Sequence, residues 1–132
     1  MPYPSRELVW PADAGPVARF LGETWNALGP NLSLHPGDFW WRAGIRQGRD
    51  IRIFEDGMGQ PVGLVEYDIR DASADMAVHP DHPDLERLLI EWTEAEIFRR
   101  TDATRVCLGG FEGNTSRHSL LTSMAYERTD SF

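Results

Sequence analysis

The segment between residues 74 and 108 constrains the fold more than any other part of the sequence. Residues 74–78 are predicted to form a strand, residues 84–100 an amphipathic helix that follows Pro83, and residues 105–108 a further strand. A strand, a helix and a strand in succession predict two parallel strands joined by a right-handed crossover. This unit places the chain in the α/β class, in which helices cover the faces of a sheet.

A predicted antiparallel hairpin precedes this unit. Residues 51–55 and 62–69 are rich in strand-forming side chains, and the polar, glycine-containing segment 56–60 between them is typical of a turn. The hairpin and the parallel pair together predict a central mixed sheet, an α+β arrangement flanked by helices. The other predicted elements are a strand at 7–10, helices at 16–28, 39–47 and 115–124, a loop at 30–37 and a strand at 126–132.

Size and charge limit the domain count and the partners. A chain of 132 residues has room for one domain. Its 21 acidic and 13 basic residues give a net charge of −8, which disfavours nucleic acid and anionic membranes as partners. The first residues lack the apolar stretch of a signal peptide, and a single cysteine, Cys107, excludes an intramolecular disulfide. We therefore expect a cytoplasmic protein in which Cys107 is buried and inert.

Two segments resemble the GCN5-related N-acetyltransferase (GNAT) family. The first is Met76-Ala77-Val78-His79-Pro80-Asp81-His82 with the helix that follows it. The second runs through Val106-Cys107-Leu108, Asn114, Leu120-Leu121 and Tyr126-Glu127. The resemblance implies one GNAT-like domain over residues 1–132, lacking the last strand of the fold. It further implies transfer of an acetyl group from acetyl-CoA to an amine by direct attack.

The resemblance also implies a set of residues for the cofactor. Family members carry a glycine-rich loop at the start of the helix, where backbone N–H groups and the helix dipole receive a diphosphate. Here that stretch has no glycine, Pro83 removes one N–H group, and Asp84 and Glu86 add negative charge. These features oppose a polyanion. The residues implied to bind acetyl-CoA are Ala77, Val78, His79, His82, Arg87 and Asn114.

Catalysis in the family needs a base for the ammonium and an acid for the leaving thiolate. Glu66 and Asp75, on predicted neighbouring strands, are the candidate bases, although carboxylates at strand ends are more often simply solvated. The family often places its acidic tyrosine seven residues after the asparagine, where this sequence has Leu121. Tyr126 is the candidate substitute.

Two alternatives remain open from the sequence. His79 and His82 lie near Asp81 and Asp84, but two histidines around a proline turn do not predict a metal site, and none is expected. The damaged diphosphate loop favours a second function, a non-catalytic GNAT-like domain that serves as structural partner or small-ligand sensor. The expected partners are an amine acceptor, and either a second copy in a homodimer or a second domain in a longer, tandem protein.

Overall fold

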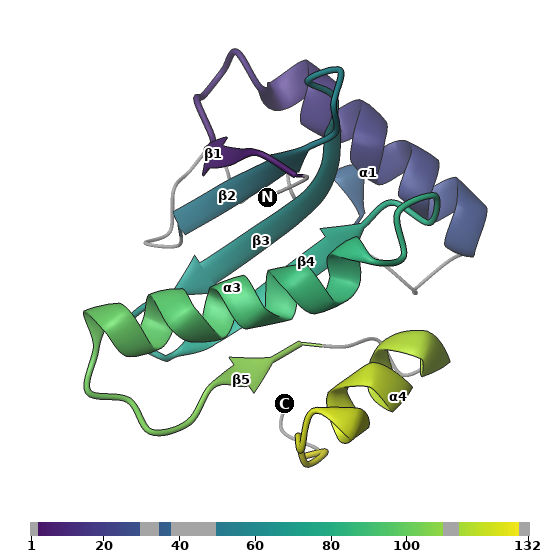
Figure 1. Cartoon of the computed structure of the whole chain (residues 1–132). Helices are drawn as coiled ribbons and strands as arrows, with labels where there is room; N and C mark the ends of the chain where they lie inside the picture. Colours follow the sequence, from purple (N-terminus) through teal and green to yellow (C-terminus); the bar gives the residue numbers. More distant parts are fainter. Residues whose placement is uncertain (1–2, 30–34, 38–49, 110–113, 130–132) are drawn as a thin grey trace.

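The computed structural model describes residues 3–29, 35–37, 50–109 and 114–129 (Figure 1). The predicted helix at 39–47 lies outside these residues, as does most of the predicted loop at 30–37. The elements are β1 (Ser5–Glu7), α1 (Ala14–Leu28), β2 (Asp50–Glu55), β3 (Pro61–Asp68), β4 (Ser73–Val78), α3 (Leu85–Arg100), β5 (Cys107–Leu108) and α4 (Thr115–Ser123).

The strands form one mixed sheet in the order β1-β2-β3-β4-β5. Neighbouring strands from β1 to β4 run antiparallel, whereas β4 and β5 run parallel and are joined through α3. The predicted mixed sheet and its parallel pair are therefore confirmed. The β2–β3 turn closes on the Asp56 carboxylate, whose Oδ1 accepts the N–H groups of Met58 and Gln60, each at 2.9 Å.

Helices cover both faces of the sheet, as Figure 1 shows. The core on one face comes from α1 and the sheet: Val17, Phe20, Leu21, Ile53, Leu64 and Ala77. The core on the other face centres on α3: Phe54, Val65, Met76, Leu85, Leu89 and Ile90. Because both faces are covered, every residue of β3 is buried.

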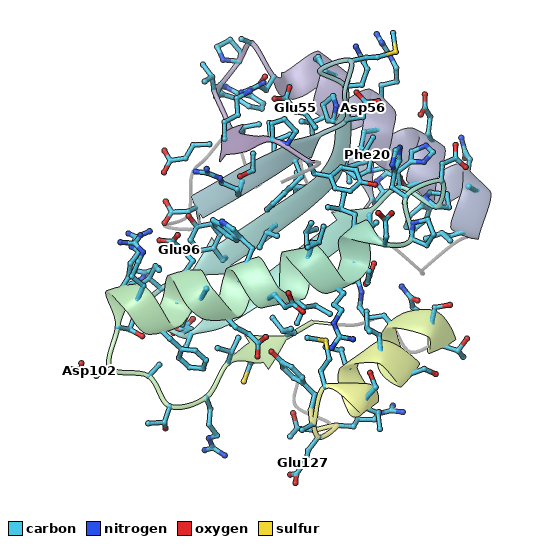
Figure 2. The ribbon with its side chains drawn as sticks, viewed as in Figure 1. Phe20, Glu55, Asp56, Glu96, Asp102 and Glu127 are labelled. Carbon is cyan, nitrogen blue, oxygen red and sulfur yellow. The ribbon has the colours of Figure 1, made fainter. Side chains whose placement is uncertain are left out.

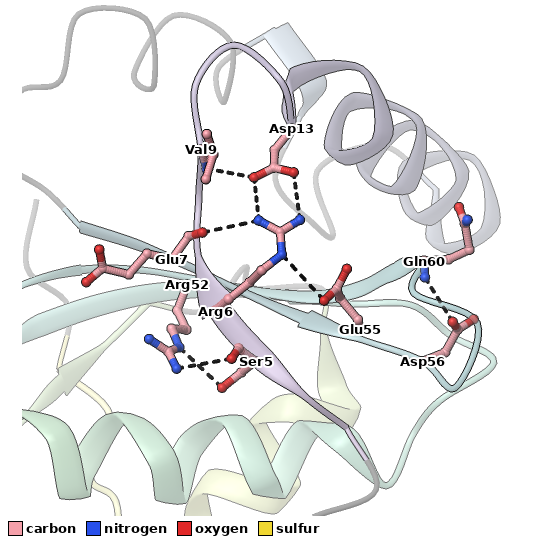
Figure 3. A network of polar contacts seen from close by, with 9 residues as sticks. All are labelled: Ser5, Arg6, Glu7, Val9, Asp13, Arg52, Glu55, Asp56 and Gln60. Carbon is pink, nitrogen blue, oxygen red and sulfur yellow. Dashed lines mark hydrogen bonds and ion pairs between the residues drawn. The ribbon is translucent and has the colours of Figure 1, made fainter.

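A polar network ties the start of α1 to the edge of the sheet (Figure 3). Both Asp13 oxygens accept hydrogen bonds from the Arg6 guanidinium of β1 at 2.7 Å, and Oδ2 also accepts the N–H of Val9 at 2.6 Å. The same guanidinium lies 3.5 Å from a carboxylate oxygen of Glu55 in β2. The guanidinium therefore connects the first strand, the first helix and the second strand.

The C-terminal part departs from its prediction. Residues 126–129 form no strand, so the expectation of a strand from Tyr126 is wrong there, and residues 130–132 lie outside the described part of the chain. After α4 the chain turns through Ala125, whose φ of 67° lies in the left-handed region. Cys107 was expected to be buried but is exposed, because β5 lies at the edge of the described sheet. None of the described helices is long and apolar enough to span a membrane.

Candidate active site

β4 and β5 diverge soon after they meet. Their pairing covers Ser73 and Ala74 opposite Cys107 and Leu108, and it ends with the Gly109 N–H, which donates to the Ala74 carbonyl at 2.8 Å. Within the described residues, no strand pairs with β4 on this side from Asp75 to Val78. We call this opening the β4–β5 fork. An open strand edge is a ready partner for an extended chain that carries amide groups.

Two carboxylates lie next to each other beside the fork. Glu66 of β3 stands directly opposite Asp75 of β4 in the antiparallel register. Glu66 is 1% exposed, and Asp75 is half-buried. Gly109 fits against Asp75 so closely that a Cβ at this glycine would lie 1.8 Å from the Asp75 Oδ1 atom. The structure therefore brings together the two candidate bases, at the mouth of the fork.

Tyr126, the candidate acid, lies on the other face of the sheet. Side chains alternate along a strand, so Glu66 shares the α1 face with Leu64. Tyr126 instead packs against the α3 core. Burial and the nearby negative charge of Glu94 raise the pKa of Tyr126, which keeps its hydroxyl protonated at neutral pH. The structure does not bring Tyr126 together with the two carboxylates.

The turn between β4 and α3 has few backbone donors to offer a diphosphate. Most of its N–H groups donate within the protein, and Pro80 and Pro83 contribute none. The Tyr3 hydroxyl contacts His82 Nδ1 at 3.1 Å and donates to Asp84 at 3.0 Å, so these two side chains have an internal partner as well. The donations are His79 N–H to Val62 O, Asp81 N–H to His79 Nδ1, His82 N–H to His79 O and Leu85 N–H to His82 O.

The other residues implied for the cofactor make contacts within the protein or lie in its core. Arg87 points away from the core and pairs with Glu91 at 3.0 Å on the exposed side of α3. Asn114 caps α4 by accepting the N–H of Arg117 at 3.2 Å. Ala77 is buried on the α1 face of β4, and Val78 on its α3 face.

Sequence reasoning missed Arg117. This α4 residue is only 5% exposed, and its Nη1 atom donates to the Met76 carbonyl of β4 at 2.9 Å. Its Nε atom also donates to the carboxylate of Glu86, in the first turn of α3. No local pattern signals this contact, since Arg117 and Met76 are 41 residues apart.

A separate hollow of about 340 Å³ lies between α1, the β2–β3 turn and the β4–α3 turn. Phe20 and Asp56, which Figure 2 labels at this corner of the molecule, both line it. Its charged and imidazole side chains are Arg19, Glu23, Asp56, His79, Asp81 and His82. Across the described parts of the chain, no group of three or more His, Cys, Asp or Glu residues is arranged to hold a metal ion.

Solved structures share this architecture. A GCN5-related N-acetyltransferase from Sphaerobacter thermophilus superposes with a TM-score of 0.73 at 21% identity, over 95% of this chain and 43% of that protein. The chain thus spans less than half of that relative. A GNAT acetyltransferase from Staphylococcus aureus Mu50 gives the same TM-score at 11% identity, over 98% and 89% of the two chains.

The chain has the GNAT acetyltransferase fold. A spermidine N-acetyltransferase from Vibrio cholerae, solved in complex with CoA and spermine, matches at a TM-score of 0.67 and 18% identity, over 97% of this chain and 83% of that one. No protein-family model matches the sequence, and no curated protein does. At these identities the likeness establishes the GNAT fold, and the predicted resemblance is confirmed at that level.

Proposed function

We propose that this GNAT-fold chain is an N-acetyltransferase that uses acetyl-CoA as acetyl donor and an amine as acceptor. One observation carries the proposal: the buried Glu66 faces Asp75 beside the open edge of β4. The edge can pair with the amide groups in the pantetheine arm of acetyl-CoA. The β4–α3 turn offers the diphosphate no comparable fit, because most of its backbone donors are already used.

The proposed reaction is a direct aminolysis of the thioester. The Glu66 carboxylate accepts a proton from the acceptor ammonium, directly or through one water, and leaves a neutral amine. The amine nitrogen then forms a bond to the acetyl carbon as the carbon–sulfur bond breaks, and the nitrogen loses its second proton to water as the amide forms. The thiolate takes up a proton from solvent, and Glu66 returns its proton to solvent before the next cycle. Asp75 holds negative charge next to Glu66 and favours a cationic acceptor.

Polyamines are the acceptors that we would test first. The chain carries a net charge of −8, and one GNAT relative by fold is a spermidine N-acetyltransferase. The assay follows release of the free thiol from acetyl-CoA over a panel of polyamines, amino acids and peptide N-termini. Turnover with any amine supports the proposal, and absence of both turnover and acetyl-CoA binding contradicts it.

The variant Glu66→Gln tests the base. We expect kcat to fall by about 100-fold or more, since general-base catalysis contributes on this scale, while affinity for acetyl-CoA stays unchanged. Glu91→Gln is the matched control, because it makes the same change on an exposed side chain of α3. Equal turnover in the wild type and Glu66→Gln would remove Glu66 from the mechanism.

The β4–α3 turn favours a second candidate function. A non-catalytic GNAT-like domain has no need of a diphosphate cradle, and the β4–α3 turn uses most of its backbone donors internally. Such a domain would act as a structural partner or ligand sensor for a second subunit or a tandem domain. Calorimetric titration with acetyl-CoA separates the two functions: the enzyme binds it, and the non-catalytic domain shows no binding at millimolar concentration.

A further inference from the structure

Arg117 is the best-buried cation among the residues that the structure describes, and it makes two specific contacts with other described residues. The residue is 5% exposed, and burial of a guanidinium is unfavourable unless every part of it finds a partner. Glu86 neutralises its charge, and the Met76 carbonyl accepts one of its N–H groups at 2.9 Å. The side chain is therefore held in one place by α3 and β4 together.

That place is the β4–β5 fork. The carbonyl groups of alternate residues face β5, beginning just before β4: Ala72 accepts the N–H of Cys107 at 2.9 Å, and Ala74 in β4 accepts the N–H of Gly109 at 2.8 Å. The next carbonyl on the same side belongs to Met76, and it accepts from Arg117. The guanidinium thus continues the hydrogen-bond ladder at the first position beyond β5.

We propose that Arg117 is an internal competitor for the β4–β5 fork and determines how tightly an acyl-CoA binds there. This inference rests on the proposed function. An extended pantetheine arm pairs with β4 by donating its amide N–H groups to the β4 carbonyls that accept no hydrogen bond from the β5 segment. The first of these carbonyls is Met76 O. Arg117 already fills this position, so the arm enters only when the side chain leaves.

Glu86 strengthens this competition. With Arg117 in place, the Glu86 carboxylate near the start of α3 is neutralised by a buried cation. If Arg117 leaves, the Glu86 carboxylate loses this partner, and its negative charge opposes a polyanionic ligand. Both effects act in one direction, so removal of the pair is expected to favour binding more than removal of Arg117 alone.

The sign of the effect separates this role from the obvious alternative. If Arg117 binds the anionic ligand directly, Arg117→Met weakens acetyl-CoA binding, because a cation is lost. If Arg117 competes for the fork, the same substitution strengthens binding although a positive charge disappears. S-acetylpantetheine, which lacks the phosphates, gives a second measure, since its affinity depends on the fork and little on charge.

The experiment is calorimetric titration of the full chain with acetyl-CoA and with S-acetylpantetheine. Arg117→Met/Glu86→Gln is expected to bind both about tenfold or more tightly than the wild type, the scale of one hydrogen bond to a charged group. The control Arg99→Met/Glu96→Gln makes the same change at the far end of α3 and leaves affinity unchanged. Circular dichroism and Tm verify that each variant is folded.

Three outcomes overturn the inference. Equal or weaker binding of both ligands by the double variant removes the competition, while acetyl-CoA binding by the wild type would leave the proposed function standing. A gain for acetyl-CoA alone shows that charge, and not the fork, is responsible. No binding by any variant rejects the proposed function and the inference with it. If the double variant does not fold, Glu86→Gln alone decides, because it loosens the arginine and is expected to strengthen binding of both ligands.

Discussion

Ala125 at the end of α4 provides the sharpest test of the local structure. Its φ is 67°, and the backbone closes around it: the Ala125 N–H donates to Thr122 O at 3.1 Å, and the Tyr126 N–H donates to Leu121 O at 2.9 Å. This is the Schellman arrangement, in which the left-handed position is usually glycine. An alanine there is strained, so we predict that Ala125→Gly stabilises the protein.

The magnitude follows from two opposing terms. A left-handed conformation costs an L-residue about 1–2 kcal/mol. The larger backbone entropy of glycine in the unfolded chain offsets about 0.5–1 kcal/mol of the stability gained by relieving this strain. The net gain is about 0.5–1 kcal/mol. For a chain of 132 residues, an unfolding entropy of about 2.1 cal/mol/K per residue converts this gain into a rise in Tm of about 2–4 °C.

Thermal unfolding followed by circular dichroism measures this shift. Ala95→Gly is the matched control, because Ala95 is exposed on the right-handed helix α3 and the same substitution there costs about 1 kcal/mol. Ala72→Gly is a second positive case, since Ala72 has a φ of 51°. The reasoning is refuted if Ala125→Gly lowers Tm as Ala95→Gly does.

Two further predictions concern the core and the network around Arg6. Gly63→Ala should lower the free energy of unfolding in urea by about 1–2 kcal/mol, because the added Cβ would lie 2.7 Å from the Leu85 Cδ2 atom. Gly57→Ala is the control and should be neutral, because Gly57 has open space around it. Equal effects of the two substitutions would contradict this prediction. The Arg6 guanidinium holds the pKa of Asp13 below its ordinary 3.8. The ion pair of Asp13 with Arg6 therefore stabilises the folded protein fully above pH 3.8, and this stabilisation is lost as the pH falls through the lowered pKa of Asp13. Asp13→Asn should cost about 2 kcal/mol at pH 7 and flatten the loss of stability in acid, and an unchanged pH slope would refute the assignment.

The sequence predicted the sheet well because the pattern there is local. The strand–helix–strand unit from Ala74 to Leu108 and the hairpin around Asp56 each contain their own turn and periodicity, so connectivity and direction follow from chain geometry. The strand predicted from Tyr126 does not form in its described part. Its residues have strand propensity, but a strand also needs a partner strand elsewhere in the chain, and propensity does not show whether one is there.

The candidate site was predictable only in part. The adjacency of Glu66 and Asp75 follows from the register of two consecutive strands, and the two prolines of the β4–α3 turn predict that it has few N–H groups to offer. Tyr126 was assigned by its distance along the chain, which does not tell one face of the sheet from the other. No sequence pattern pointed to Arg117. It binds the Met76 carbonyl of β4, which becomes available only where β4 and β5 separate.

The exposed Cys107 makes the fork directly observable. It is the single cysteine of the chain, it lies in β5, and its N–H bonds to Ala72 just before the strands diverge. A fluorine or nitroxide label on this thiol therefore reports from one defined position without any mutation. Spectra recorded during titration with acetyl-CoA would show whether β5 moves when a ligand enters, and at what rate.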